Sequence, residues 1–134
     1  MRFAVTCVFL GLATPVWSAP ICTVSHVTDG DTLRLTCAGV LHKVRLLGYD
    51  TPETFHPHCA AEKAAGDRAT AVLLALVAQG PVTGIRFQGG DRYGRDLADV
   101  QIAGRDVGGV MLASGLARPY AGHKHPDWCG ILGG

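Results

Sequence analysis

The chain has 134 residues, of which 48% are hydrophobic and 17% charged, and its formal net charge is +1. A sequence of this length predicts a single domain rather than a multidomain assembly. The near-neutral charge excludes a general polyanion-binding field, so a polyanionic ligand would have to be recognised by a local cluster of cations.

The first 18 residues have the pattern of a secretory signal peptide. Arg2 supplies a positive charge, Phe3 to Leu12 form an apolar stretch, and residues 15–19 are a polar end with small side chains. The apolar run is shorter than the ~20 residues that a membrane-spanning helix needs, so no transmembrane helix is expected. We expect cleavage after Ser18 and a secreted or periplasmic mature domain over residues 19–134, with no membrane attachment. A buried N-terminal strand or helix is the alternative for this segment.

The mature domain is predicted to begin with three strands. Residues 21–28 and 31–37 flank Asp29-Gly30, a dipeptide that favours a two-residue hairpin turn. Residues 40–47 form a third strand, which ends before the turn signal Asp50-Thr51-Pro52.

Four cysteines remain after removal of the leader, an even number that is typical of an oxidising compartment. They are Cys22, Cys37, Cys59 and Cys129. In the hairpin register Cys22 faces Cys37, which leaves Cys59 to pair with Cys129. A bulge near the turn would shift this register, so the other pairings stay open.

A helix and two further strands are predicted next. Residues 54–59 have the composition of a loop, and apolar residues recur at spacings of three and four over residues 60–79, which indicates a helix. Gly66 is expected to separate the first turn of this helix from the rest. Alternating patterns over residues 82–87 and 97–102 predict strands, joined by a polar, glycine-rich loop.

A short helix over residues 107–114 ends before Gly115, and the tail from Tyr120 shows no periodicity. The order is therefore three strands, a helix, two strands and a helix. This order predicts an α+β, mainly β fold, namely a five-stranded OB-fold barrel with two packed helices, rather than a parallel sheet.

Four carboxylates lie at the predicted turns. Asp29 and Asp31 flank Gly30, and Asp50 and Glu53 enclose a Thr-Pro dipeptide. Two oxygen-rich turns at the ends of neighbouring strands could bind one hard cation such as Ca²⁺ or Mg²⁺. These residues are also ordinary turn formers, so the pattern alone fits both interpretations.

Arginines lie near both acidic turns in the sequence. Arg45 precedes the second turn, and the loop between the last two strands carries Arg92, Tyr93 and Arg95. A guanidinium group matches phosphate oxygens bidentately, and an aromatic ring can stack on a base. A single arginine or tyrosine, however, is more often a solvated or packed residue.

A zinc site is an alternative use of two other clusters. They consist of His56, His58 and Cys59, and of His123, His125 and Cys129. Neither cluster has the Cys-x2-Cys spacing of a structural zinc finger, and exported thiols more often oxidise.

Four ordered blocks together give a more specific signal. They are residues 29–32 (DGDT), 44–53 (VRLLGYDTPE), 91–98 (DRYGRDLA) and 115–117 (GLA). In these blocks the chain resembles the staphylococcal nuclease (thermonuclease) family, and the match runs from Val24 to about Tyr120.

The resemblance implies an OB-fold enzyme that hydrolyses phosphodiester bonds of DNA and RNA with one Ca²⁺, cutting endonucleolytically and leaving 3′-phosphate ends. It implies a role for each matching position. The implied metal ligands are Asp31, Asp50, Thr51 through its carbonyl, and Glu53; the implied catalytic residues are Arg45, Glu53 and Arg95; and the implied substrate-binding residues are Arg92, Tyr93 and Tyr120. We expect a monomer.

The chain also departs from the family pattern. It has an extra residue between Glu53 and Gly66, a Gly108-Gly109 pair in the last predicted helix, and little room beyond Tyr120 for a C-terminal helix. A bridge between Cys59 and Cys129 could stabilise the tail in its place. Two alternative functions stay open: a catalytically weak OB-fold nucleic-acid-binding module, and an exported metal-binding domain that uses the histidine clusters.

Overall fold

The computed structural model describes residue 11 and residues 21–134. Apart from Gly11, the predicted signal peptide lies outside the described residues. The elements, in chain order, are β1 (Cys22–Val27), β2 (Thr32–Cys37), β3 (Val40–Leu46), β4 (Tyr49–Asp50), α1 (Ala60–Val77), β5 (Val82–Gly90), β6 (Asp96–Ile102), β7 (Arg105–Asp106), α2 (Val107–Ala113), β8 (Arg118–Pro119) and α3 (Trp128–Leu132).

The main sheet has the strand order β1-β2-β3-β6-β5, and β7 pairs with β6. All its pairs are antiparallel except β3 with β6. The edge strands β1 and β5 contact each other, but within residues 21–134 no ladder joins them, so the sheet is not closed. The five long strands and two packed helices confirm the predicted OB-type fold.

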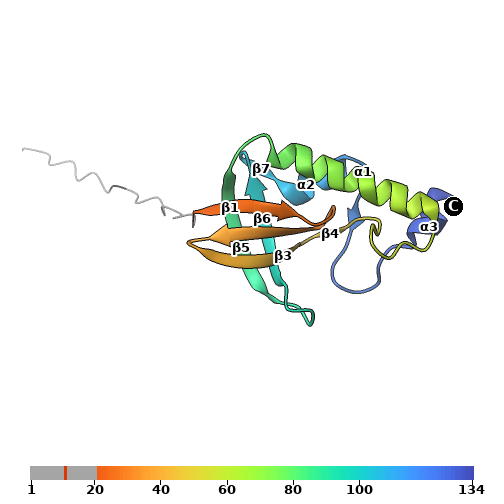
Figure 1. Ribbon diagram of the computed structural model, residues 1–134, viewed down its shortest axis with the longest axis horizontal. Coiled ribbons are helices and arrows are strands. Elements are labelled where there is room, and N and C mark those ends of the chain that lie inside the picture. The colour runs from red at the N-terminus through yellow and green to blue at the C-terminus, as the bar shows by residue number, and fades with distance from the viewer. Residues whose placement is uncertain (1–10, 12–20) are drawn as a thin grey trace, which may run out of the picture.

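Helix α1 lies along one side of the sheet, and α3 and the C-terminus lie near the first turns of α1 (Figure 1). Its buried residues include Ala69, Leu73 and Leu76, which share one apolar core with the inward-facing residues Leu33 and Val44 of β2 and β3. The shared core lies next to the start of β2 and the end of β3, the points at which the two acidic turns join the sheet.

The expectation that Gly66 interrupts the helix is wrong, because α1 is continuous through this position. Gly66 instead permits a close approach. A Cβ at Gly66 would lie 2.7 Å from the backbone oxygen of Pro52 and 3.0 Å from that of Glu53. The missing side chain therefore lets α1 pack directly against the segment that carries Glu53.

The two-residue turn predicted at Asp29-Gly30 is also wrong. Val27, the last residue of β1, pairs with Leu33, and β2 begins at Thr32, so the connection spans residues 28–31. A bulge between Val24 and His26 restores the predicted register farther along the hairpin. Gly30 does not have a positive φ. A Cβ there would lie 2.9 Å from side-chain atoms of both Ala69 and Thr51, so Gly30 serves close packing of this turn against the next one.

Both expected disulfides are present. Cys22 is bonded to Cys37, its cross-strand neighbour, and Cys59 to Cys129. The second bond joins residues 70 positions apart and ties the C-terminal segment to the start of α1.

We expect the double substitution Cys59→Ser with Cys129→Ser to lower the free energy of unfolding by about 2–4 kcal/mol, because the bond restricts a long loop of the unfolded chain. Urea unfolding followed by circular dichroism measures the change. Reductant should lower the urea midpoint of the wild type and leave that of a variant lacking all four cysteines unchanged. An equal midpoint for the wild type and the double variant would contradict the prediction.

Sequence periodicity missed four short elements, because none is long enough to show a period. They are β4, β7, β8 and α3. Strand β4 pairs with β8, and Asp127 begins α3 by accepting a hydrogen bond from the Gly130 amide.

Strand β5 also runs beyond the predicted end at residue 87 to Gly90, so the loop to β6 is shorter than expected. No helix in the described part of the chain is long and apolar enough to cross a membrane.

Candidate active site

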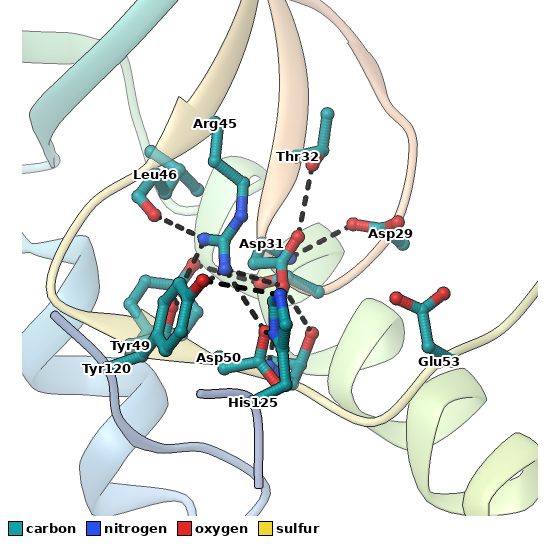
Figure 2. Close-up of polar contacts among 12 residues, drawn as sticks. Asp29, Asp31, Thr32, Arg45, Leu46, Tyr49, Asp50, Glu53, Tyr120 and His125 are labelled. Atoms are coloured by element: carbon teal, nitrogen blue, oxygen red, sulfur yellow. Dashed lines mark hydrogen bonds and ion pairs between the residues drawn. The ribbon is translucent and has the colours of Figure 1, made fainter. Parts of the chain in front are cut away.

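Two aspartates from separate turns meet at one arginine. Nη2 of Arg45, on β3, lies 3.3 Å from Asp31 Oδ2 and 3.2 Å from Asp50 Oδ1 (Figure 2). The register explains the first contact, because Arg45 pairs with Thr32, the residue after Asp31. All three side chains are largely buried. The two acidic turns predicted from the sequence therefore converge.

The Arg45 guanidinium is fixed in place by backbone oxygens as well as by the two carboxylates. Nη1 donates to the carbonyl oxygens of Leu46 and Tyr49, and Nη2 also donates to Tyr49. These acceptors belong to the turn that leads from β3 to Asp50. Arg45 is consequently preorganised, because its rotamer is set before any ligand binds.

Hydroxyl and amide donors fix the Asp31 carboxylate. Thr32 Oγ1 donates to Asp31 Oδ1 at 3.0 Å, while the Thr51 amide and hydroxyl lie 3.4 and 3.2 Å from Asp31 Oδ2. The buried Tyr49 hydroxyl donates to the Gly30 carbonyl oxygen at 2.9 Å, which ties one turn to the other. Thr51 therefore lies beside both Asp31 and Asp50.

Glu53 and Asp29 add negative charge at the edge of this cluster. The Glu53 side chain lies on the same side of Asp31 as Asp29 and forms no drawn contact (Figure 2). Loss of hydration, followed by repulsion from Asp31 and Asp50, raises the pKa of Glu53 above its usual value. Burial, followed by repulsion from Asp31, raises the pKa of Asp29 to about 7. Burial and the neighbouring carboxylates thus both disfavour the charged forms of Asp29 and Glu53.

Glu62 supports the segment that carries Glu53, and sequence reasoning did not identify it. The Glu62 side chain is buried; its Oε1 accepts a hydrogen bond from the Glu53 amide at 3.3 Å, and its Oε2 accepts one from the His58 amide at 2.7 Å. The only sequence signal for Glu62 is that an acidic residue lies in the first turn of a predicted helix. Acidic residues are common at that position, so the signal does not single out a supporting role.

The C-terminal segment reaches the same cluster. Trp128 Nε1 donates to Asp50 Oδ2 at 2.9 Å, and His125 Nδ1 lies 3.0 Å from Asp50 Oδ1. The Tyr120 ring stacks on His125 with 4.5 Å between ring centroids, and the Arg45 guanidinium carbon lies 5.6 Å from the Tyr120 ring centroid. The aperiodic tail carries no sequence signal for Trp128, and the sequence indicates His125 only as a ligand of the alternative zinc site.

We expect Trp128→Phe to lower the free energy of unfolding by about 1–3 kcal/mol, because it keeps a buried aromatic ring but leaves Asp50 Oδ2 without its donor. Urea unfolding in the presence of chelator measures this change. Ile131→Val, an exposed substitution on the same short helix, serves as the control. Equal urea midpoints for Trp128→Phe and the wild type would contradict the prediction.

Arg95 approaches the cluster from the loop between β5 and β6. Its Nε donates to Asp91 Oδ2 at 2.7 Å, and its Nη1 lies 3.5 Å from Thr32 Oγ1. Burial alone would raise the pKa of Asp91. Hydrogen bonds from Arg95 and from the Tyr93 amide outweigh this effect and hold the pKa of Asp91 below its usual value. From this loop, Arg95 thus reaches the strand pair that carries Arg45.

A cleft of about 900 Å³ connects the two arginines with the aromatic residues predicted from the sequence. Its lining includes Arg45, Arg95, Tyr93 and Tyr120. Arg92 also lines the cleft, and its guanidinium carbon lies 4.9 Å from the Tyr93 ring centroid. The structure therefore brings the implied metal-ligand, catalytic and substrate-binding residues to the acidic cluster or to this adjoining cleft.

The cysteines of the zinc alternative are not available as thiolates, because Cys59 and Cys129 are bonded to each other. His58 Nδ1 lies 3.2 Å from Glu62 Oε2, and His125 contacts Asp50. His56 and His123 are exposed. The two histidine-cysteine clusters therefore do not form the zinc site that this alternative requires.

Comparison with known proteins identifies a family. The family model described as staphylococcal nuclease homologue matches residues 43–127. The chain is 38% identical over 99 residues to the SPbeta prophage-derived endonuclease YokF of Bacillus subtilis (strain 168), covering 72% of this chain and 33% of that protein. It is 37% identical over 99 residues to the endonuclease YncB of the same organism, covering 72% and 46%. It is 35% identical over 96 residues to the thermonuclease of Staphylococcus intermedius, covering 71% and 56%. The matched region thus spans between a third and somewhat over half of these relatives.

Proposed function

The chain belongs to the staphylococcal nuclease family, and on this premise we propose that it is a calcium-dependent nuclease that hydrolyses phosphodiester bonds of DNA and RNA. The cut is endonucleolytic and leaves 3′-phosphate ends. The observation that carries the proposal is the meeting of Asp31 and Asp50, from two separate turns, at the guanidinium group of Arg45. The names of the relatives, two endonucleases and a thermonuclease, support the same reaction class.

The donor set fits a calcium ion. Ca²⁺ prefers several oxygen ligands, and carboxylates and backbone carbonyls supply them here. We assign the ligands to Asp31, Asp50, the Thr51 carbonyl and Glu53. Burial and, after it, repulsion from neighbouring carboxylates raise the pKa values of Asp29 and Glu53, and a divalent cation would relieve the repulsion. Bound at these residues, the ion supplies Lewis-acid stabilisation of negative charge on a phosphoryl oxygen.

The protein's own residues supply the remaining steps. Attack on a phosphodiester places negative charge on the equatorial oxygens, and preorganised donors stabilise this charge more in the transition state than in the ground state. Arg45 binds the phosphoryl oxygens, and Glu53 orients the attacking water. Arg95 stabilises charge on the phosphorane and on the departing 5′ oxygen. The fixed position of Arg45 between two carboxylates and two backbone oxygens suits this role.

The adjoining cleft binds the rest of the nucleotide. Arg92 pairs with a neighbouring phosphate, and the rings of Tyr93 and Tyr120 stack against the sugar or base. Tyr93 is 65% exposed at the cleft, with the Arg92 and Arg95 guanidinium carbons 4.9 and 5.5 Å from its ring centroid. Tyr120 contacts both His125 and Arg45, which couples base binding to the position of the reactive phosphate.

We further propose that residues 1–18 direct export and that the mature domain, residues 19–134, acts as a monomer outside the cytoplasm. Two disulfides support an oxidising compartment, since such bonds rarely persist in the cytosol.

Digestion of a closed circular plasmid with calcium present tests the proposed reaction. We expect nicked and then linear DNA, because only an endonuclease cuts a molecule that has no ends. The fragments should be extended by a polymerase only after phosphatase treatment, as 3′-phosphate ends require. A protein that retards the plasmid in a gel without nicking it would be a binding module instead.

A further inference from the structure

Positive charge is concentrated in one part of this near-neutral chain. Strands β1, β2 and β3 contain no aspartate or glutamate. They carry three cationic side chains, those of Arg34, Lys43 and Arg45, and two histidines, His26 and His42. All 11 acidic residues therefore lie elsewhere in the sequence. This segregation supplies the local cation cluster that the overall composition could not reveal.

The register places two of these cations side by side. Arg34 pairs with Lys43 across β2 and β3, and His26 pairs with Arg34 across β1 and β2. Because alternate side chains point to opposite faces of a strand, and the neighbours Leu33 and Val44 are fully buried, exposed Arg34 and Lys43 lie on the outer face of the sheet.

The same outer face leads to the candidate active site. Arg45 follows Lys43 by two residues on β3, so both side chains leave the strand on one side, with their Cα atoms about 6.6 Å apart. Thr32, which pairs with Arg45, lies 3.5 Å from Arg95 Nη1. Arg45 and Thr32 thus form one row of this face, which Arg95 reaches from the loop between β5 and β6, and the next row holds Arg34 and Lys43.

The Arg34 and Lys43 side chains are unpaired in the part of the chain that the structure describes. Among residues 21–134, neither side chain takes part in a hydrogen bond or an ion pair. Arg86 and Lys63, in contrast, form ion pairs with the neighbouring carboxylates of Asp99 and Asp67. Like charges directly opposite each other destabilise a sheet. A pair of this kind is suited to hold an anion that is not part of the protein.

We propose that Arg34 and Lys43 form a distal phosphate-binding site for the nucleic-acid strand that occupies the active site. The inference rests on the proposed function and extends it: substrate binding is not confined to the cleft beside Arg95 and Tyr93 but continues across β2 and β3. His26 lies at the outer end of this track. The occupant is the backbone of a single strand, because the site continues directly from the residues that bind the reactive phosphate.

Binding of a fluorescein-labelled 20-nucleotide DNA strand, measured by fluorescence anisotropy in chelator, tests the site without cleavage. We expect Arg34→Ala with Lys43→Ala to weaken binding about tenfold or more at low salt and to reduce the slope of log Kd against log salt by about 1.4, because two phosphate contacts are lost. Arg34→Lys with Lys43→Arg should retain most of the affinity. The same double substitution should weaken the binding of an unlabelled four-nucleotide competitor less than that of the 20-nucleotide strand, because the shorter strand does not extend to the distal site.

Arg68→Ala with Arg105→Ala is the matched control, since it removes two exposed positive charges from α1 and β7 instead. An equal loss of affinity in this control, or an unchanged salt slope in the Arg34/Lys43 variant, would overturn the inference. Thermal unfolding of the same variants detects a folding defect, which is not expected for exposed, unpaired side chains. Plasmid nicking by the wild type is measured separately, so the proposed reaction stands or fails independently of the distal site.

Discussion

Replacing Arg95 by alanine should lower kcat for a long single-stranded DNA by about 10³-fold, equivalent to about 4 kcal/mol of transition-state stabilisation. The reason is geometric. Arg95 is held by Asp91 at the edge of the cleft, facing the strand pair that carries Arg45. Its charge therefore acts on the phosphate as negative charge accumulates, and KM should change much less than kcat.

Two further variants identify the cause of this loss. Arg95→Lys keeps the charge but not the bidentate fork, so its kcat should remain well below that of the wild type. Arg105→Ala removes an exposed arginine from β7, outside the cleft, and should have near-wild-type kinetics. If Arg95→Ala turned over substrate at a rate close to that of the wild type, Arg95 would have no catalytic role.

Asp50→Asn should lower activity by about 10²-fold or more, and added calcium should not restore it, because a hard cation needs the charged oxygen. The substitution keeps the size of a side chain that accepts hydrogen bonds from Trp128 and Arg45, and the amide oxygen of asparagine still accepts one of the two. Loss of activity should therefore come from the missing charge rather than from collapse of the site. Initial cleavage rates across a calcium titration measure both effects.

The matched control is Asp67→Asn, which changes an exposed aspartate paired with Lys63 on α1. We expect its calcium dependence to equal that of the wild type. Full activity of Asp50→Asn at high calcium would show that Asp50 changes only the affinity for calcium. Full activity of this variant without added calcium would exclude Asp50 as a calcium ligand.

The sequence predicted the long elements and the acidic turns because their signals are local. The apolar spacing of residues 60–79 and the alternation in residues 31–37 each follow from a single element. The disulfide between Cys22 and Cys37 followed from the hairpin register, although the predicted turn was wrong, because a bulge compensated for the longer connection.

The remaining features depend on contacts between distant segments, and no local pattern reports them. Gly30 and Gly66 looked like a turn former and a helix breaker, but both allow close approach between segments. Trp128 and Glu62 support Asp50 and Glu53 from positions 78 and 9 residues away along the chain. Such residues are identified only once the fold has brought the segments together.

Cleavage of single-stranded DNA by chelator-treated protein, followed as calcium is added back, tests the central claim most directly. The account predicts no cleavage in chelator and a saturable return to the full rate as the carboxylates of the two turns bind one ion. Cleavage in chelator at the same rate as in calcium would contradict it, since the acidic cluster around Arg45 would then serve no purpose in the reaction.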